Sequence, residues 1–91
     1  MNNKPNYKFE PIAEDPDSYW STTDLQLATT LVTADFPVFS LEKEGQDKVH
    51  FIFEKSDGLE KAVDQYWRDE LSLNPRRLFN DYRDLKTRLH S

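Results

Sequence analysis

The residue types that most often perform acid–base chemistry or bind metals are sparse in this chain. It has two histidines, His50 and His90, and no cysteine. Disulfides, thiolate nucleophiles, thiolate zinc sites and iron–sulfur clusters are therefore excluded. About forty residues separate the two histidines, so a shared metal or acid–base site is not supported. We expect ordinary surface or half-buried histidines and no metal site.

The acidic residues and glycines do not form a catalytic or cofactor-binding motif either. The acidic run at residues 14–17 (EDPD) is followed by no spaced loop of oxygen ligands, so it predicts a solvated turn rather than a Ca²⁺ or Mg²⁺ site. Two isolated glycines cannot build a phosphate-binding loop or a nucleophile elbow. We therefore expect a protein that is not an enzyme and binds no cofactor.

The clearest chemical signal is an uneven distribution of charge. Residues 1–72 hold seven Lys/Arg and fifteen Asp/Glu, whereas residues 73–91 hold five and two, which gives −8 and +3 and a total of −5. An acidic chain is a poor candidate for neutralising many phosphates. The basic end nevertheless interleaves cations with Phe79 and Tyr82, a combination that can bind phosphates and stack on a base. Its cations are Arg76, Arg77, Arg83, Lys86 and Arg88.

The same basic segment has a simpler structural interpretation, which we favour. Phe79 and Tyr82 recur at helical spacing with Leu78, Leu85 and Leu89, which predicts that both rings lie in the core. The cations would then form a solvated face or pair with acidic residues of the preceding helix. Nucleic-acid binding through this helix is our second choice. Mimicry of nucleic acid by the acidic body is a weaker alternative, because −8 over 72 residues is modest.

Residues 1–20 predict an extended N-terminal arm. They contain three of the five prolines, and proline fixes φ and removes a hydrogen-bond donor. The arm is nevertheless too aromatic for a plain linker, so it either packs on the domain or docks a protein partner. The candidate partner-binding residues are Tyr7, Phe9, Tyr19 and Trp20.

The rest of the chain predicts one compact unit of helices and strands. A helix is expected over residues 23–35, begun by a capping box between Thr23 and Gln26 and ended by Pro37. Residues 38–41 and 49–54 predict two strands, and the polar residues 42–48 predict the loop of a hairpin.

Two further helices are expected after the hairpin. Asp57 is the expected N-cap of the first, whose apolar face comprises Leu59, Ala62, Val63, Tyr66, Trp67 and Leu71. Asn74 and Pro75 have the residue types of the N-cap and first turn of the second.

These elements predict a small α+β domain over residues 21–91, of order α-β-β-α-α. A β-hairpin alone is marginally stable, so its aromatic face must pack against helices. The exposed edges of a hairpin invite pairing with a partner or with a second copy, so we consider a homodimer through the hairpin edge.

The chain shows no segment that would place it in or across a membrane. Its longest apolar run is three residues, at 51–53, whereas a spanning helix needs about 20. The N-terminus lacks the apolar core of a secretory signal. We expect a cytoplasmic protein with no membrane contact.

The order of several short motifs resembles that of a known family. The motifs are residues 21–25 (STTDL), 27–28, 36–37, 49–54 (VHFIFE), 66–67, 70–71, 74–76 (NPR), 79–80 and 85–86. Over about residues 21–91 this pattern is similar to a family of short bacterial and phage proteins described as a domain of unknown function (number 5659). The resemblance implies a bacterial or mobile-element origin and a cytoplasmic setting. It carries over no functional residue, but it draws attention to Trp67, Arg76 and Asn80.

The sequence as a whole predicts a non-catalytic protein-interaction module, a small accessory or regulatory protein that binds another protein. If a phage or mobile element encodes it, the partner would be a host protein. The alternative is a nucleic-acid-binding protein that uses the basic C-terminal helix.

Overall fold

The computed structural model describes residues 17–90, and these form six elements. The expected α+β class is confirmed, and one further strand, β1, precedes the predicted order α-β-β-α-α. The elements are β1 (Tyr19–Thr22), α1 (Leu25–Thr33), β2 (Ser40–Glu44), β3 (Lys48–Glu54), α2 (Asp57–Trp67) and α3 (Pro75–Leu89).

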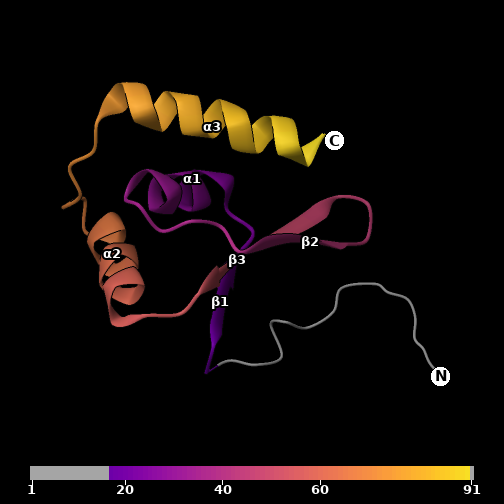
Figure 1. Ribbon diagram of the computed structural model, residues 1–91, viewed down its shortest axis with the longest axis horizontal. Coiled ribbons are helices and arrows are strands. Elements are labelled where there is room, and N and C mark those ends of the chain that lie inside the picture. Colours follow the sequence, from indigo (N-terminus) through magenta and orange to yellow (C-terminus); the bar gives the residue numbers. More distant parts are fainter. Residues whose placement is uncertain (1–16, 91) are drawn as a thin grey trace.

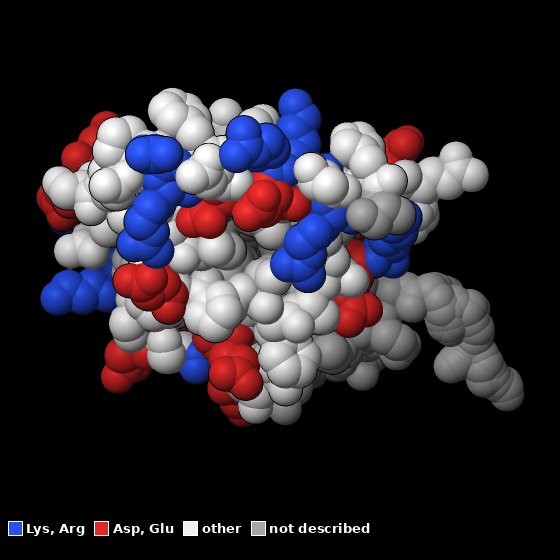
Figure 2. Space-filling model, turned by 45° about the horizontal axis from the view of Figure 1, so that its top comes forward, with Lys and Arg blue, Asp and Glu red and all other residues white. Residues whose placement is uncertain are grey.

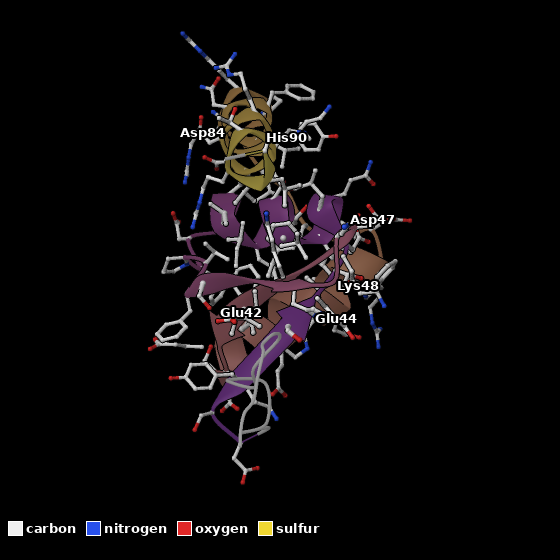
Figure 3. The ribbon with its side chains drawn as sticks, turned by 90° about the vertical axis from the view of Figure 1, so that its right-hand side faces the viewer. Glu42, Glu44, Asp47, Lys48, Asp84 and His90 are labelled. Carbon is white, nitrogen blue, oxygen red and sulfur yellow. The ribbon has the colours of Figure 1, made fainter. Side chains whose placement is uncertain are left out.

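The elements are stacked around α1, the helix at the centre of the domain (Figure 1). Viewed along the long axis of the molecule, α3 lies above α1, and α1 lies above the sheet (Figure 3). Both α2 and α3 pack against α1, which also contacts β1. The position of α3 therefore depends mainly on its contact with one other helix.

The sheet has three antiparallel strands in the order β1-β3-β2, so β3 is central. Trp20 is paired with Phe53 across β1 and β3, and Leu41 with Phe51 across β2 and β3. Strand β1 lies partly in the segment that we expected to be an arm. It is only four residues long and its partner strand is about thirty residues away, so no local pattern indicates it.

The hairpin loop is shorter than predicted. We expected residues 42–48, but the strands extend through Glu44 and from Lys48, which leaves a turn of residues 45–47. Gly45 has a φ of +72°, a left-handed conformation that glycine adopts without strain. The prediction was wrong because it took charged residues as loop residues, whereas Glu44 and Lys48 form a cross-strand pair of opposite charge.

The core lies between the sheet and the helices, and every helix contributes to it. Strand β3 contributes two fully buried rings, and α1 packs its aliphatic side chains against them. Burial of this kind is the main stabilising term in folding. The buried apolar residues of this cluster are Leu27, Ala28, Leu31, Phe51, Phe53, Leu59, Ala62 and Leu85.

Two of the three predicted helix caps are displaced by one residue. Asp24, not Thr23, caps α1 and accepts hydrogen bonds from the Gln26 and Leu27 amides at 2.9 and 3.2 Å. Ser56, not Asp57, caps α2 and accepts from the amide of Leu59. Aspartate and serine are both strong N-cap residues, so adjacent candidates could not be separated by type alone.

The predicted start of α3 is confirmed. Asn74 caps the helix and accepts a hydrogen bond from the Arg77 amide at 3.0 Å, and Pro75 occupies the first turn. Proline suits this position because the missing amide would have no partner within the helix.

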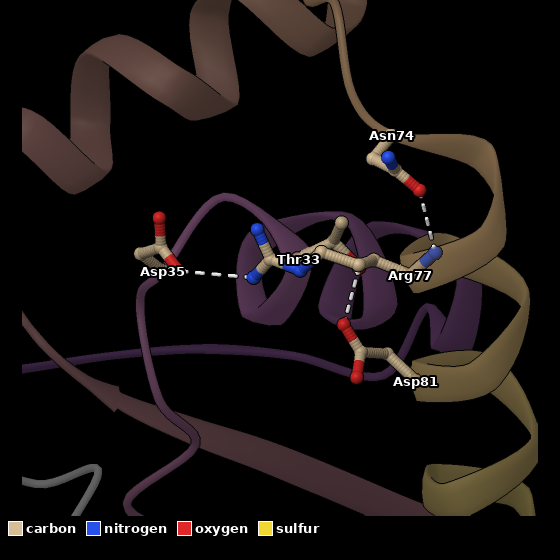
Figure 4. Close-up of polar contacts among 5 residues, drawn as sticks. All are labelled: Thr33, Asp35, Asn74, Arg77 and Asp81. Carbon is tan, nitrogen blue, oxygen red and sulfur yellow. Dashed lines mark hydrogen bonds and ion pairs between the residues drawn. The ribbon is translucent and has the colours of Figure 1, made fainter.

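Two polar contacts attach α3 to the C-terminal end of α1 (Figure 4). The Thr33 hydroxyl donates to Asp81 Oδ2 at 2.7 Å, and Arg77 pairs with Asp35 at 3.0 Å. Asp35 follows α1 with a φ of +76°, which turns the chain away from the helix axis. These contacts fix how α3 lies on α1.

Asp81→Ala should destabilise the domain by about 1–3 kcal/mol, because it removes the acceptor of a hydroxyl that water cannot reach. Thr33 is only 2% exposed. Asp81→Asn is the matched control, since it keeps an acceptor at the same position and should retain most of the stability. Urea unfolding followed by circular dichroism measures both; equal losses for the two variants would contradict the explanation.

Candidate functional site

A continuous hollow lies on the surface between α1, the C-terminal end of α2 and the first half of α3. It consists of two adjoining cavities of about 370 and 540 Å³, which share Thr30, Tyr66 and Leu78. We call it the aromatic groove, because Phe79 and Tyr82 line the first cavity and Trp67 lines the second, with Tyr66 in both. A concave, mainly apolar surface with a few polar groups is the usual form of a binding site.

Two rings of the groove are exposed where the sequence predicts burial. Trp67 is 64% exposed and Phe79 is 69% exposed. Phe79 lies about 100° around the helix from Leu78, and the residues of α3 that join the core are Leu85 and Leu89 on a narrower stripe. Trp67 ends α2, beyond the turns that carry the buried residues Leu59 and Ala62.

Periodicity alone placed these two rings in the core, but finer signals distinguish them. The spacing of Leu78, Leu85 and Leu89 defines a helical stripe from which Phe79 deviates. Trp67 is followed at once by the polar run 68–70 (RDE), which is typical of a helix end at the surface.

Tyr66 is half-buried and lines both cavities of the groove. Its ring meets that of Trp67 edge-on, with centroids 4.9 Å apart. Burial raises the pKa of the Tyr66 hydroxyl, and the nearby carboxylates of Asp24 and Asp69 raise it further. The hydroxyl is therefore neutral around pH 7 and is available as a hydrogen-bond donor rather than as a base.

The basic residues predicted to bind nucleic acid are not gathered on one face. Arg77 is held by Asp35, and Arg83 donates to the Asn80 side chain at 2.8 Å. Arg76 and Arg88 are exposed and lie outside the cavities described above. Lysines and arginines along α3 are interspersed with acidic side chains on the face that Figure 2 shows.

Arg83 and Lys86 lie beside the aromatic groove. Together with Tyr82, Thr87 and His90 they line a third hollow of about 390 Å³, which shares Tyr82 with the groove. The Lys86 ammonium lies 5.6 Å from the centre of the Tyr82 ring, within the range of a cation–π contact. The groove thus continues toward the C-terminus of α3 into a cationic end.

Of the residues predicted to bind a partner, Tyr19 and Trp20 line none of the three hollows. Tyr7 and Phe9 lie outside the described residues. Tyr19 contacts Phe39, with ring centroids 5.0 Å apart, and Phe39 is 47% exposed. Trp20 is half-buried and packs toward the core, 6.1 Å from the Phe53 ring.

His50 forms a hydrogen-bonded pair with Glu44 on the sheet. Its Nε2 lies 2.6 Å from the Glu44 carboxylate, across the hairpin. This hydrogen bond is the main reason that the pKa of Glu44 lies below its usual value; partial desolvation opposes it and Lys48 adds to it. Figure 3 places Glu42 and Glu44 on the side of the hairpin away from α1.

His50→Phe should raise the pKa of Glu44 toward the ordinary value, because the hydrogen bond to the carboxylate is lost. A lowered pKa contributes stability above the unfolded-state value, and this contribution is lost as the pH falls through the folded-state value. The difference in the free energy of unfolding between the variant and the original chain should therefore become smaller as the pH falls. NMR titration of the Glu44 carboxyl carbon measures the shift, with Glu60 of α2, which is not in the hairpin, as internal reference; an unchanged Glu44 pKa would contradict it.

Within residues 17–90 no three His, Asp or Glu side chains gather where they could hold a metal ion. In the same part of the chain no helix is long and apolar enough to cross a membrane.

A family model described as a domain of unknown function, DUF5659, matches residues 17–91. The chain belongs to this family. The match confirms the resemblance seen in residues 21–91 and begins four residues earlier, so the DUF5659 region includes β1. Searches of curated proteins and of solved structures found no match.

Of the three positions that the resemblance singled out, Trp67 ends α2 of this DUF5659 domain, and Arg76 and Asn80 belong to α3. Trp67 lines the aromatic groove. Asn80 accepts from Arg83, which lies at the cationic end of the groove. Arg76 is exposed in the first turn of α3.

Proposed function

We propose that this DUF5659 domain is a non-catalytic protein-interaction module whose partner docks in the aromatic groove. The observation that carries the proposal is the exposure of Trp67 and Phe79, which each line one of the two cavities of the groove. Contiguous exposed apolar surface marks binding sites on soluble proteins. Tryptophan and tyrosine are also enriched among the residues that dominate binding energy at protein interfaces.

The groove supports this role better than the surfaces that the sequence suggested. Trp20 is engaged in the core and Tyr19 is engaged with Phe39. The outer edge of the hairpin belongs to β2, which carries Glu42, Lys43 and Glu44, and charged edge strands discourage pairing between sheets. A homodimer through the hairpin edge therefore has less support than a partner in the groove.

A small domain that binds without catalysing a reaction suits an accessory or regulatory role in the cytoplasm. A bacterial or phage origin is part of the same proposal. A phage or mobile element that encodes such a domain would use it to bind a host protein.

Nucleic-acid binding along α3 is the second candidate, favoured by one observation. Phe79 offers an exposed ring within one helical turn of Arg83, and single-stranded nucleic acids stack on such rings beside cations. The ion pair at Arg77, the carboxylates Asp81 and Asp84 on other sides of α3 and the net charge of −5 weigh against it.

The test compares proteins captured from a bacterial lysate by the full chain and by two variants. The double variant Trp67→Ser/Phe79→Ser removes the exposed rings of the groove, and Phe39→Ser removes an exposed ring elsewhere. We expect a partner that survives nuclease treatment, that the groove variant loses and that the Phe39 variant retains, with all three proteins folded by circular dichroism. Capture that depends on nucleic acid, or that the groove variant leaves unchanged, would overturn the proposal.

A further inference from the structure

Charged side chains are distributed unevenly along the aromatic groove, with an acidic residue at one end and basic residues at the other. At the end where α2 leads into α3, the lining includes Asp69. The central stretch is lined by Gln26, Thr29, Thr30, Tyr66, Leu78, Phe79 and Tyr82, none of which is charged at pH 7. At the other end the adjoining hollow is lined by Arg83 and Lys86, with His90 beside them.

The helical arrangement of α3 separates the charges in this way. Phe79, Tyr82, Arg83 and Lys86 share one flank by their three- and four-residue spacing. Asp81 points to the other side, where its carboxylate accepts from Thr33 of α1. The flank beside the groove therefore presents cations without a carboxylate between them.

The dimensions of the groove suit a short peptide segment. The part of α3 that lines it, from Pro75 to Lys86, is about 17 Å long at 1.5 Å per residue. That length matches about three turns of a helix, and an amphipathic helix laid in an apolar groove is a common mode of protein recognition.

We propose that the groove binds an amphipathic, acidic peptide segment of a partner protein. This rests on the proposed function and adds the chemistry of the partner. Large apolar side chains of the segment occupy the uncharged centre, over Tyr66, Phe79 and Tyr82. Acidic residues at one end lie against Arg83 and Lys86, and the carboxylate of Asp69 disfavours the reverse orientation.

Charge complementarity favours this occupant over a nucleic acid. A phosphate backbone carries charge along its whole length, whereas cations line only one end of the groove. A peptide with an apolar centre and an acidic end matches the pattern of the surface. An oligonucleotide bound at the same surface would displace the peptide, so competition distinguishes the two occupants.

The test measures binding of three fluorescein-labelled probes to the full chain by fluorescence anisotropy at low salt. Two probes are amphipathic peptides of about twelve residues with identical Leu and Trp anchors, one with Glu and one with Lys at the polar positions. The third is oligo-dT of about fifteen nucleotides. We expect the acidic peptide to bind roughly fivefold or more tightly than the basic one, and oligo-dT not to displace it.

Charge reversal provides the matched variants. Arg83→Glu/Lys86→Glu should abolish the preference for the acidic peptide, whereas Lys61→Glu/Arg88→Glu makes the same change in net charge at exposed positions that line none of the three hollows and should retain most of it. Phe79→Ser should weaken both peptides. If no peptide binds, if the basic peptide binds as well as the acidic one, or if oligo-dT displaces the acidic peptide, this inference is overturned.

The results of the lysate capture and of the peptide binding together distinguish a failure of this inference from a failure of the proposed function. Groove-dependent capture of a protein from the lysate, together with a preference for the basic peptide, would leave the function standing and refute the acidic ligand. If the groove variant captured the same proteins as the full chain, both the proposed function and the acidic ligand would be refuted.

Discussion

Phe53→Ala should lower the free energy of unfolding by about 3–5 kcal/mol, the usual cost of removing a buried ring. Phe53 is fully buried in the central strand, where it contacts Trp20 of β1 and joins the core cluster. A chain of this length has a total stability on the order of 5–14 kcal/mol. The variant should therefore lose a large part of its stability and unfold at markedly lower urea concentration.

The matched control for this variant is Phe39→Ala. It removes the same ring from a position that is 47% exposed, so less apolar surface returns to water. We expect a clearly smaller loss, below about 1.5 kcal/mol. Urea unfolding of both variants, followed by tyrosine and tryptophan fluorescence, gives the comparison. If the two variants lost the same free energy of unfolding, the burial of Phe53 would not be the main source of its contribution to stability.

Leu85→Ala should loosen α3 before it unfolds the rest of the domain. Leu85 is the one residue of α3 that is fully buried, and α3 packs mainly against α1. Removing a buried leucine costs about 2–5 kcal/mol, and part of this cost falls on the docking of α3 alone. Amide hydrogen exchange should therefore rise more in α3 than in β3.

Phe79→Ala is the control on the same helix. Its ring is 69% exposed, so its removal should change neither the unfolding free energy nor the exchange of α3 by much. If Leu85→Ala raised exchange equally in α3 and β3, the domain would open only as a whole. In that case α3 would not open separately from the rest of the domain.

The helices and the hairpin could be predicted because their signals are local. The N-cap and proline at Asn74 and Pro75 placed the start of α3 correctly. The alternation in β3 identified the strand that supplies Phe51 and Phe53 to the core. Such patterns depend on neighbours three or four residues away, which a single sequence displays.

Strand β1 and the groove could not be predicted, because both depend on distant parts of the chain. Trp20 belongs to the core only because Phe53 lies opposite it in the sheet. The spacing of Phe79 and the polar run after Trp67 are local signals of exposure, but the hollow that these rings line forms only where α1, α2 and α3 meet. The sequence also displays the four-residue spacing that brings Lys86 beside Tyr82, but it does not show that α1 and α2 form a hollow next to them.

The central position of β3 also determines the order in which the sheet can form. The hairpin of β2 and β3 closes through a short turn, an event of about 1–10 μs, whereas β1 must find β3 across about thirty intervening residues. Until it does, one edge of β3 stays open to a strand from any chain. Refolding at high protein concentration should therefore favour exchange of β1 between two molecules, a dimer built without any new contact.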